Sequence, residues 1–203
     1  LVDRAESRGL AVWQLAPGVL ERVADTVTPQ PVLAVVGLVD RPLEELAGAG
    51  LVVVAAGVRD PGNAGTILRS AQAAGADGVV CCGGSVDLYS PKAVRASAGA
   101  LFHLPVVVGR EPVDVLERIG AWGLRRLAAT ARGGLDYADA DLRGPVAVVV
   151  GNEAHGLDPA LASVVDASVT IPLHGGAESL NVGVATAVLC FEAARQRRAA
   201  VAL

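Results

Sequence analysis

The sequence predicts an α/β domain built around a parallel sheet. Most of its six strand-like runs are short, continuous apolar stretches rich in valine, which is typical of strands buried on both faces of such a sheet. Helical patterns alternate with these runs, and polar loops that contain glycine directly follow three of them. This alternation favours a doubly wound fold, in which ligands bind beyond the carboxyl ends of the strands.

Residues 1–42 depart from this pattern. They contain one helical stretch at Pro17–Thr26, a break at Thr28–Pro31, and a single strand at Val32–Val39, and residues 40–42 resemble a linker. So small a piece cannot bury a core of its own. We expect it to be the end of a domain whose first part precedes Leu1.

From residue 51 onward the elements alternate regularly. We expect strands at Leu51–Gly57, Gly78–Cys82, Pro105–Val108, Arg126–Thr130, Val146–Val150 and Ser168–Ile171. We expect helices at Ala64–Ala74, Pro91–Gly99, Val113–Trp122, Pro159–Val165 and Val182–Arg197. In the first of these helices Ile67, Leu68 and Ala71 recur at helical spacing. Before the fourth helix Asp158 is available as an N-cap, with Pro159 at the first helical position.

Composition excludes several classes of protein. The chain has 203 residues, of which 52% are hydrophobic, yet no apolar run reaches the roughly 18 to 20 residues of a membrane span. It shows no signal-peptide pattern, so we expect a cytoplasmic protein whose three cysteines are buried free thiols. A net charge of −4 argues against broad, non-specific nucleic-acid binding. The basic residues are almost all Arg, which suits bidentate phosphate contacts, and Lys92 is the only lysine.

The loop Ile171–Val182 is the most informative segment. Glu178, Ser179 and Asn181 are three hydrogen-bonding side chains within four positions, just before an apolar helix. Either Ser179 or Asn181 is a suitable N-cap for that helix, and a helix needs only one. The remaining polar side chains therefore indicate a ligand.

Two further loops have the same character. In Asp60–Gly65 we expect Pro61-Gly62 to make a turn and Asn63 to cap the next helix, with Arg69 six residues later and within reach of the strand ends. A solvated surface position is the simpler interpretation of that arginine. In Gly151–Gly156 a carboxylate, Glu153, directly follows a buried strand, and folding needs do not explain it because Asp158 already supplies the helix cap.

Several common sites are absent from the sequence. The first strand is not followed by Gly-x-Gly-x-x-Gly, and no Gly-x-x-x-x-Gly-Lys-Ser/Thr occurs. His103, His155 and His174 are scattered without zinc spacing, and there is no nucleophile elbow for a Ser-His-Asp triad. We expect no metal.

Together the three loops resemble the motifs of the SpoU, or TrmH-type, RNA ribose methyltransferases of the knotted SPOUT superfamily. The matching residues are Asn63-x-Gly65-x-x-x-Arg69, Gly151-Asn-Glu-x-x-Gly156-Leu and Ile171-Pro-Leu…Glu178-Ser-Leu-Asn-Val182, and Ser90–Gly99 is similar to the family's connection between its second and third strands. The resemblance implies a parallel-sheet α/β-knot domain over residues 43–203, with a trefoil knot in its last third. It also implies that residues 1–42 are the remnant of a small, ribosomal-protein-like α/β domain that binds RNA.

The resemblance further implies a cofactor and a set of site residues. S-adenosyl-L-methionine would bind the backbone and apolar side chains of five residues: Thr130, Gly151, Asn152, Ile171 and Leu180. Arg69 would help to activate a ribose 2′-hydroxyl, with Asn63, Glu153, Ser179 and Asn181 assisting. Because a neutral guanidinium at pH 7 costs about 9 kcal/mol, we favour Arg69 as a phosphate ligand and electrostatic stabiliser of the alkoxide rather than as a base.

The function that follows from the resemblance is methylation of a ribose in RNA, with ribosomal RNA favoured, by a homodimer. Three alternatives remain open at this point: a transfer-RNA ribose methyltransferase, an RNA-binding module of the same fold with negligible catalysis, and a methyltransferase that acts on a small molecule or protein. Arg95 is a further candidate for a phosphate contact, although a structural surface role is equally compatible with its position.

Overall fold

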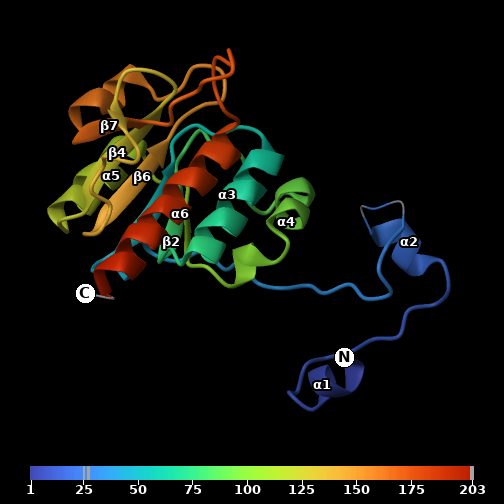
Figure 1. Ribbon diagram of the computed structural model, residues 1–203. Helices are drawn as coiled ribbons and strands as arrows, with labels where there is room; N and C mark the ends of the chain where they lie inside the picture. Colours follow the sequence, from blue (N-terminus) through green and yellow to red (C-terminus); the bar gives the residue numbers. More distant parts are fainter. Residues whose placement is uncertain (25, 27, 202–203) are drawn as a thin grey trace. The chain divides into compact units, whose positions relative to one another are not determined.

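The computed structural model describes residues 1–24, 26 and 28–201, and it divides the chain into two units, Leu1–Gly37 and Leu38–Leu203 (Figure 1). The first unit contains two short helices, α1 (Val2–Glu6) and α2 (Val19–Val23), and neither buries a residue. Helix α2 occupies the middle of the expected helix Pro17–Thr26, of which Asp25 lies outside the described residues.

The prediction of a strand at Val32–Val39 is wrong. These residues take no strand conformation, and Val35 is 98% exposed. A strand needs a neighbour to hydrogen-bond its backbone, and the described part of the first unit contains no other strand.

The second unit is built on a seven-stranded parallel sheet in the order β3-β2-β1-β6-β4-β7-β5. Its strands are β1 (Leu51–Ala55), β2 (Gly78–Cys81), β3 (Val106–Val108), β4 (Arg125–Thr130), β5 (Leu135–Asp136), β6 (Val146–Val150) and β7 (Ala167–Thr170). All six strands expected from residue 51 onward are present, with ends that differ by two residues at most. Only β5 was not predicted, because a two-residue edge strand leaves no pattern in the sequence.

Four helices and three short 3₁₀ segments surround the sheet. They are α3 (Pro61–Ala74), α4 (Pro91–Ser97), α5 (Pro112–Ala121) and α6 (Val182–Val201), with η1 (Leu43–Leu46), η2 (Ala100–Phe102) and η3 (Pro159–Ser163). The segment expected to be a helix at Pro159–Val165 is the 3₁₀ segment η3, capped by Asp158 as predicted. No helix in the described ranges is long and apolar enough to cross a membrane.

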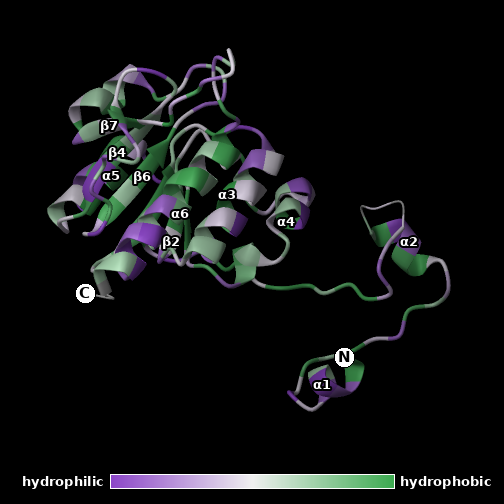
Figure 2. Cartoon of the chain, in the orientation of Figure 1, coloured by the Kyte–Doolittle hydropathy of each residue, from purple (hydrophilic) through white to green (hydrophobic). Residues whose placement is uncertain are grey.

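The sheet has an apolar layer on each face, as the green interior of Figure 2 shows. Residues of β1 alternate between them: Val53 belongs to the same apolar cluster as Ile67 of α3 and Leu189 of α6, while Val54 shares the other cluster with Leu116 of α5. Burial on both faces explains why the strands are continuous valine runs. All three cysteines are buried and free, as expected.

Helix α3 packs closely against α4 and α6 because two glycines lie at the contacts. A Cβ atom on Gly65 would overlap the side chain of Ala96 and lie 2.7 Å from Ser97 N. A Cβ atom on Gly183 would lie 2.9 Å from Thr66 Cβ. The second contact brings the N-terminus of α6 beside the N-terminal half of α3, where two of the three polar loops enter their helices.

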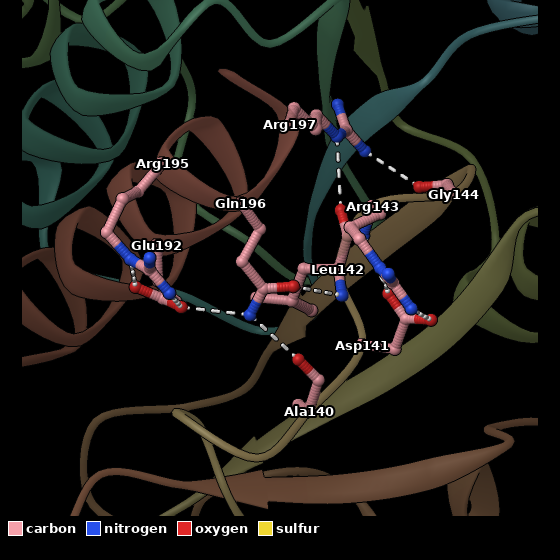
Figure 3. Close-up of polar contacts among 9 residues, drawn as sticks. All are labelled: Ala140, Asp141, Leu142, Arg143, Gly144, Glu192, Arg195, Gln196 and Arg197. Atoms are coloured by element: carbon pink, nitrogen blue, oxygen red, sulfur yellow. Dashed lines mark hydrogen bonds and ion pairs between the residues drawn. The ribbon is translucent and has the colours of Figure 1, made fainter. Parts of the chain in front are cut away.

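Side chains at the other end of α6 hold the loop between β5 and β6 (Figure 3). Gln196 accepts a hydrogen bond from Leu142 N at 2.9 Å and donates one to Ala140 O at 2.9 Å. Arg197 donates to three carbonyl oxygens, those of Leu142 (3.1 Å), Gly144 (2.9 Å) and Gly50 (2.7 Å). The loop and the residue that precedes β1 are thereby fixed to the last helix.

Candidate functional site

A cavity of about 650 Å³ lies at the carboxyl ends of β4, β6 and β7. Thr130 ends β4, Gly151 follows β6 and Ile171 follows β7, so the three strand ends supply its wall. Every residue expected to hold a cofactor lines this cavity: Thr130, Gly151, Asn152, Ile171 and Leu180. Its position agrees with the general placement of ligands in parallel α/β sheets.

One wall of the cavity is apolar and another is bare backbone. Ile171, Leu173 and Leu180 line the apolar side. At Gly151 a Cβ atom would overlap the carbonyl of Gly156 and lie 2.5 Å from Leu157 N, so only glycine fits there. A flat ligand with polar edges suits such a site, because the apolar side chains cover its faces and backbone groups can bond its edges.

A chain of hydrogen bonds joins the three polar loops. Asn181 Nδ2 donates to Asn63 Oδ1 at 2.7 Å, and Asn63 Nδ2 donates to Glu153 Oε1 at 2.9 Å. Glu153 also accepts from the backbone N–H groups of Asp60 (3.0 Å) and Arg59 (3.2 Å to Oε2). Residues more than a hundred positions apart in the sequence are thus held within one network.

The groups at the two ends of this series of hydrogen bonds determine the orientation of the side-chain amides of Asn63 and Asn181. Glu153 as a carboxylate can only accept, so Asn63 presents its NH₂ group to it. The backbone N–H groups of Gly183 and Val184 can only donate, and both bond Asn181 Oδ1, at 2.9 and 3.2 Å. Asn181 is therefore the N-cap of α6, one of the two residues expected for that role.

The environment of Glu153 favours its ionised form. Partial burial alone would raise the pKa of this carboxyl, but the hydrogen bonds from Asn63 and from the backbone of Asp60 and Arg59 outweigh that effect and lower it. Glu153 is thus a fixed negative charge whose Oε1 is occupied by donors, which suits it to positioning rather than to proton transfer.

The prediction that Asn63 caps α3 is wrong. Asp60, not Asn63, caps this helix, by accepting a hydrogen bond from Asn63 N at 2.9 Å, and Pro61 takes the first helical position. The helix therefore begins three residues earlier than expected. This leaves the Asn63 side chain free to join Glu153 and Asn181.

The remaining expected residues divide into two groups. Ser179 lines the cavity with Asn63, Glu153 and Asn181. Arg69 lies on the exposed side of α3 and is not part of the cavity wall, so the structure does not bring it to the other four residues. Glu178, also singled out in the sequence, is exposed and outside the wall.

His155 is a cavity residue that sequence reasoning missed. It lies in the same loop as Glu153, and its Nδ1 is 3.1 Å from Asn152 Oδ1. From the sequence, the histidines were interpreted only as possible zinc ligands or triad members. Its place between Asn152 and Gly156, inside a polar loop after a strand, is the signal that could have found it.

No metal site accompanies the cavity. Within the part of the chain that the structure describes, no three His, Cys, Asp or Glu side chains come close enough to hold a metal ion.

Comparisons with known proteins agree with the fold. Residues 50–191 match the family model described as the SpoU rRNA Methylase family. The chain is 37% identical over 183 residues to the 23S rRNA (guanosine(2553)-2′-O)-methyltransferase RlmP of Bacillus subtilis (strain 168), covering 90% of this chain and 72% of that protein. It is 41% identical over 145 residues to the 23S rRNA (uridine(2479)-2′-O)-methyltransferase of Streptomyces viridochromogenes, covering 68% of this chain and 50% of that relative.

Solved structures give the same result. The chain is similar to an rRNA methyltransferase from Sinorhizobium meliloti, with a TM-score of 0.83 and 32% identity over 96% of this chain and 75% of that one. It is also similar to the SpoU methyltransferase AviRb from Streptomyces viridochromogenes in complex with AdoMet, with a TM-score of 0.68 and 36% identity over 73% of this chain and 60% of that one. The predicted family and parallel α/β fold are confirmed.

Proposed function

This chain belongs to the SpoU rRNA methylase family, and we propose that it transfers a methyl group from S-adenosylmethionine to a ribose 2′-hydroxyl of ribosomal RNA. In this transfer the hydroxyl oxygen would bond the methyl carbon, the carbon–sulfur bond would break with its electron pair left on sulfur, and the hydroxyl proton would pass to solvent. The observation that carries the proposal is that the three polar loops, far apart in the sequence, converge on one cavity at the ends of β4, β6 and β7.

The residues around the cavity fit the cofactor. Ile171 and Leu180 offer apolar surfaces for the adenine ring, and Gly151 lies in the cavity wall, where backbone groups can bond a polar edge of the ring. Thr130 and Asn152 complete the set proposed to hold it. The bound cofactor supplies an electrophilic methyl group on a positively charged sulfur.

The polar network is proposed to position the ribose. Glu153 and Asn63 hold the start of α3 against the cavity, and Ser179 places a hydroxyl in its wall that can bond the sugar. Asn181 ties this wall to α6. Alignment of the hydroxyl with the methyl carbon is the main requirement of an in-line transfer.

Arg69 is proposed to bind a phosphate of the RNA, since its place outside the cavity wall does not support the expected role at the alkoxide. Its exposed position on α3 supports a contact with a large, anionic substrate outside the cavity. The active assembly is proposed to be a homodimer, in which the exposed Val184 and Phe191 of α6 are covered by a second copy.

Residues 1–42 are proposed to belong to an RNA-binding domain. Trp13 and Val35 are 77% and 98% exposed within the first unit, which supports packing of this unit against further protein. A trefoil knot formed by the last strands and their loops, and a location in the cytoplasm with the RNA substrate, are proposals that rest on the family.

The first test is methyl transfer from radiolabelled S-adenosylmethionine to ribosomal and transfer RNA, with Arg69→Ala in parallel. Alkali-resistant label in ribosomal RNA, lost in the variant, is the expected result. Label in transfer RNA alone would favour the alternative substrate. Cofactor binding by calorimetry without transfer to either RNA would favour a binding module.

A further inference from the structure

Two cationic residues lie beside the cavity, where the loop after β1 enters α3. The backbone N–H groups of Arg59 and Asp60 both donate to the carboxylate of Glu153, which lines the cavity. Lys92 is in the first turn of α4, a helix that lies beside α3 (Figure 1), and its Nζ donates to Asp60 Oδ2 at 3.3 Å. Arg59 and Lys92 are therefore held close to the cavity wall, although neither is part of it.

The needs of the fold explain neither cation. The Arg59 side chain is exposed, and within the described ranges no hydrogen bond or ion pair involves its guanidinium. The side chains of Lys92 and Asp60 are 64% and 46% exposed, so water screens their ion pair and it adds little stability. Asp60 caps α3 through its other oxygen, which accepts from Asn63 N, so the cap does not depend on Lys92.

These two side chains offer hydrogen-bond donors that the protein does not use. Every N–H donor of the Arg59 guanidinium and most of those of the Lys92 ammonium have no acceptor in the described part of the chain. Arg binds phosphate through two parallel N–H groups, and Lys binds it as a compact point charge. Because the chain as a whole carries a net charge of −4, a polyanion needs local groups of this kind to hold it.

We propose that Arg59 and Lys92 form a phosphate-binding site for the RNA strand, beside the nucleotide that is methylated. The site is connected by hydrogen bonds to Glu153 and Asn63, which are proposed to position the ribose. A phosphate bound there therefore belongs to the target nucleotide or to the one next to it. This role rests on the proposed function.

The site is separate from the phosphate contact proposed for Arg69. Arg69 lies about 12 Å further along the axis of α3 than Pro61, the first residue of that helix. The two contacts would therefore hold different phosphates, and an RNA strand bound at both would follow α3 past the edge of the cavity.

The test is the salt dependence of RNA binding by Arg59→Gln, Lys92→Gln and the double variant. The probe is a fluorescently labelled single-stranded RNA of mixed sequence, because phosphate contacts do not read the bases. Each lost contact should reduce the slope of log affinity against log salt by about 0.7, and the double variant should bind on the order of tenfold more weakly.

The matched control is Arg198→Gln, which removes the same charge from an exposed side chain near the C-terminal end of α6. Its RNA affinity and salt slope should equal those of the wild type. An equal loss in this control would attribute the effect to overall charge and overturn the proposal.

Methyl transfer to ribosomal RNA separates a substrate contact from a structural role. For the double variant we expect a higher KM for RNA, with kcat and the calorimetric affinity for the cofactor unchanged. Arg59→Lys and Lys92→Arg retain the charge and should keep most of the salt slope. If Lys92 served the fold alone, Lys92→Gln would lower the free energy of unfolding and leave the salt slope as it is.

Each outcome bears on a different proposal. A wild type that methylates ribosomal RNA, and whose double variant keeps the RNA affinity and the salt slope, refutes the phosphate site alone. A wild type that binds RNA, loses affinity as expected in the double variant and transfers no methyl group refutes the proposed function and supports the site. A wild type that neither binds nor methylates RNA refutes both.

Discussion

The two ends of α6 are held by polar side chains in different ways. At the N-terminal end, Asn181 bonds another side chain, Asn63, which in turn bonds Glu153. At the C-terminal end, Gln196 and Arg197 bond backbone atoms of the loop between β5 and β6 (Figure 3). The first group lines the cavity at the ends of β4, β6 and β7, whereas the second fixes a loop to a helix beside a more open pocket that Gln196 lines.

This difference distinguishes a functional site from a purely structural contact. Side chains that satisfy backbone groups complete the fold, since each such group would otherwise lack a partner. Asn181 and Glu153 also accept from backbone N–H groups, but the bonds that join them through Asn63 link side chains beside a cavity, and that arrangement is better explained by a ligand. We therefore expect changes at the N-terminal end to alter binding and rate, and changes at the C-terminal end to alter stability.

Gly151→Ala should have the largest effect. The added Cβ would overlap Gly156, so the loop must move out of the cavity wall, and we expect cofactor affinity to fall on the order of 100-fold, about 2.7 kcal/mol. Calorimetry measures it. Gly144→Ala is the control. Gly144 lies in the loop held by the C-terminal end of α6, and nothing lies within 4 Å of its added Cβ. Equal affinities for the two variants would contradict the proposal that the loop after β6 holds the cofactor.

Arg197→Met should lower the free energy of unfolding by about 2 kcal/mol, because three carbonyl oxygens lose a charged donor. Urea denaturation measures this loss, and cofactor affinity of the folded variant should stay unchanged. Arg198→Met is the control, since that exposed side chain lies on the same helix. If affinity fell while stability held, the proposed division between the two ends would be wrong.

Glu153→Gln should slow methyl transfer by about tenfold while changing the unfolding free energy by less than about 1 kcal/mol. The new NH₂ group can face that of Asn63, and the chain of amides then loses its fixed direction. Steady-state kinetics should place the loss in kcat. A loss confined to stability would mean that Glu153 serves only to join loops.

The same variant should change how stability depends on pH. Because the folded state lowers the pKa of Glu153, its contribution is present above the usual glutamate value near 4.3 and is lost as pH falls through the folded value. The stability difference between wild type and Glu153→Gln should therefore shrink as pH falls below about 4. Denaturation at a series of pH values measures it, and a difference that grew on acidification would show the opposite sign.

Asp141→Asn should have the smallest effect. Asp141 pairs with Arg143 at 2.8 Å, which lowers its pKa, but both side chains are more than half exposed and water screens the pair. We expect no measurable change in melting temperature or activity. A clear loss would show that the loop depends on more than Gln196 and Arg197.

Much of the domain could be predicted because its signals are local. The valine run Val146–Val150 was predicted at the bounds that the structure has, and the three glycine-bearing loops were recognised by residues that are neighbours in sequence. Nine of the ten expected site residues line one cavity, and Arg69 alone does not.

What sequence reasoning missed depends on distant partners. Val32–Val39 has the composition of a strand but no neighbour to pair with. The hydrogen bond from Arg197 to Gly50 joins residues 147 positions apart, and no local sequence pattern predicts it.

The contacts of Arg197 also bear on the synthesis of the protein. The carbonyl of Gly50, just before the first strand of the sheet, receives its donor only after the ribosome has made α6, the last of the described elements. The carbonyl groups of Leu142 and Gly144 also lack their donor, Arg197, until α6 has been made. A nascent chain that lacks α6 therefore keeps these backbone groups and the apolar face beneath them open to water, and the domain cannot reach its final form before α6 has been made.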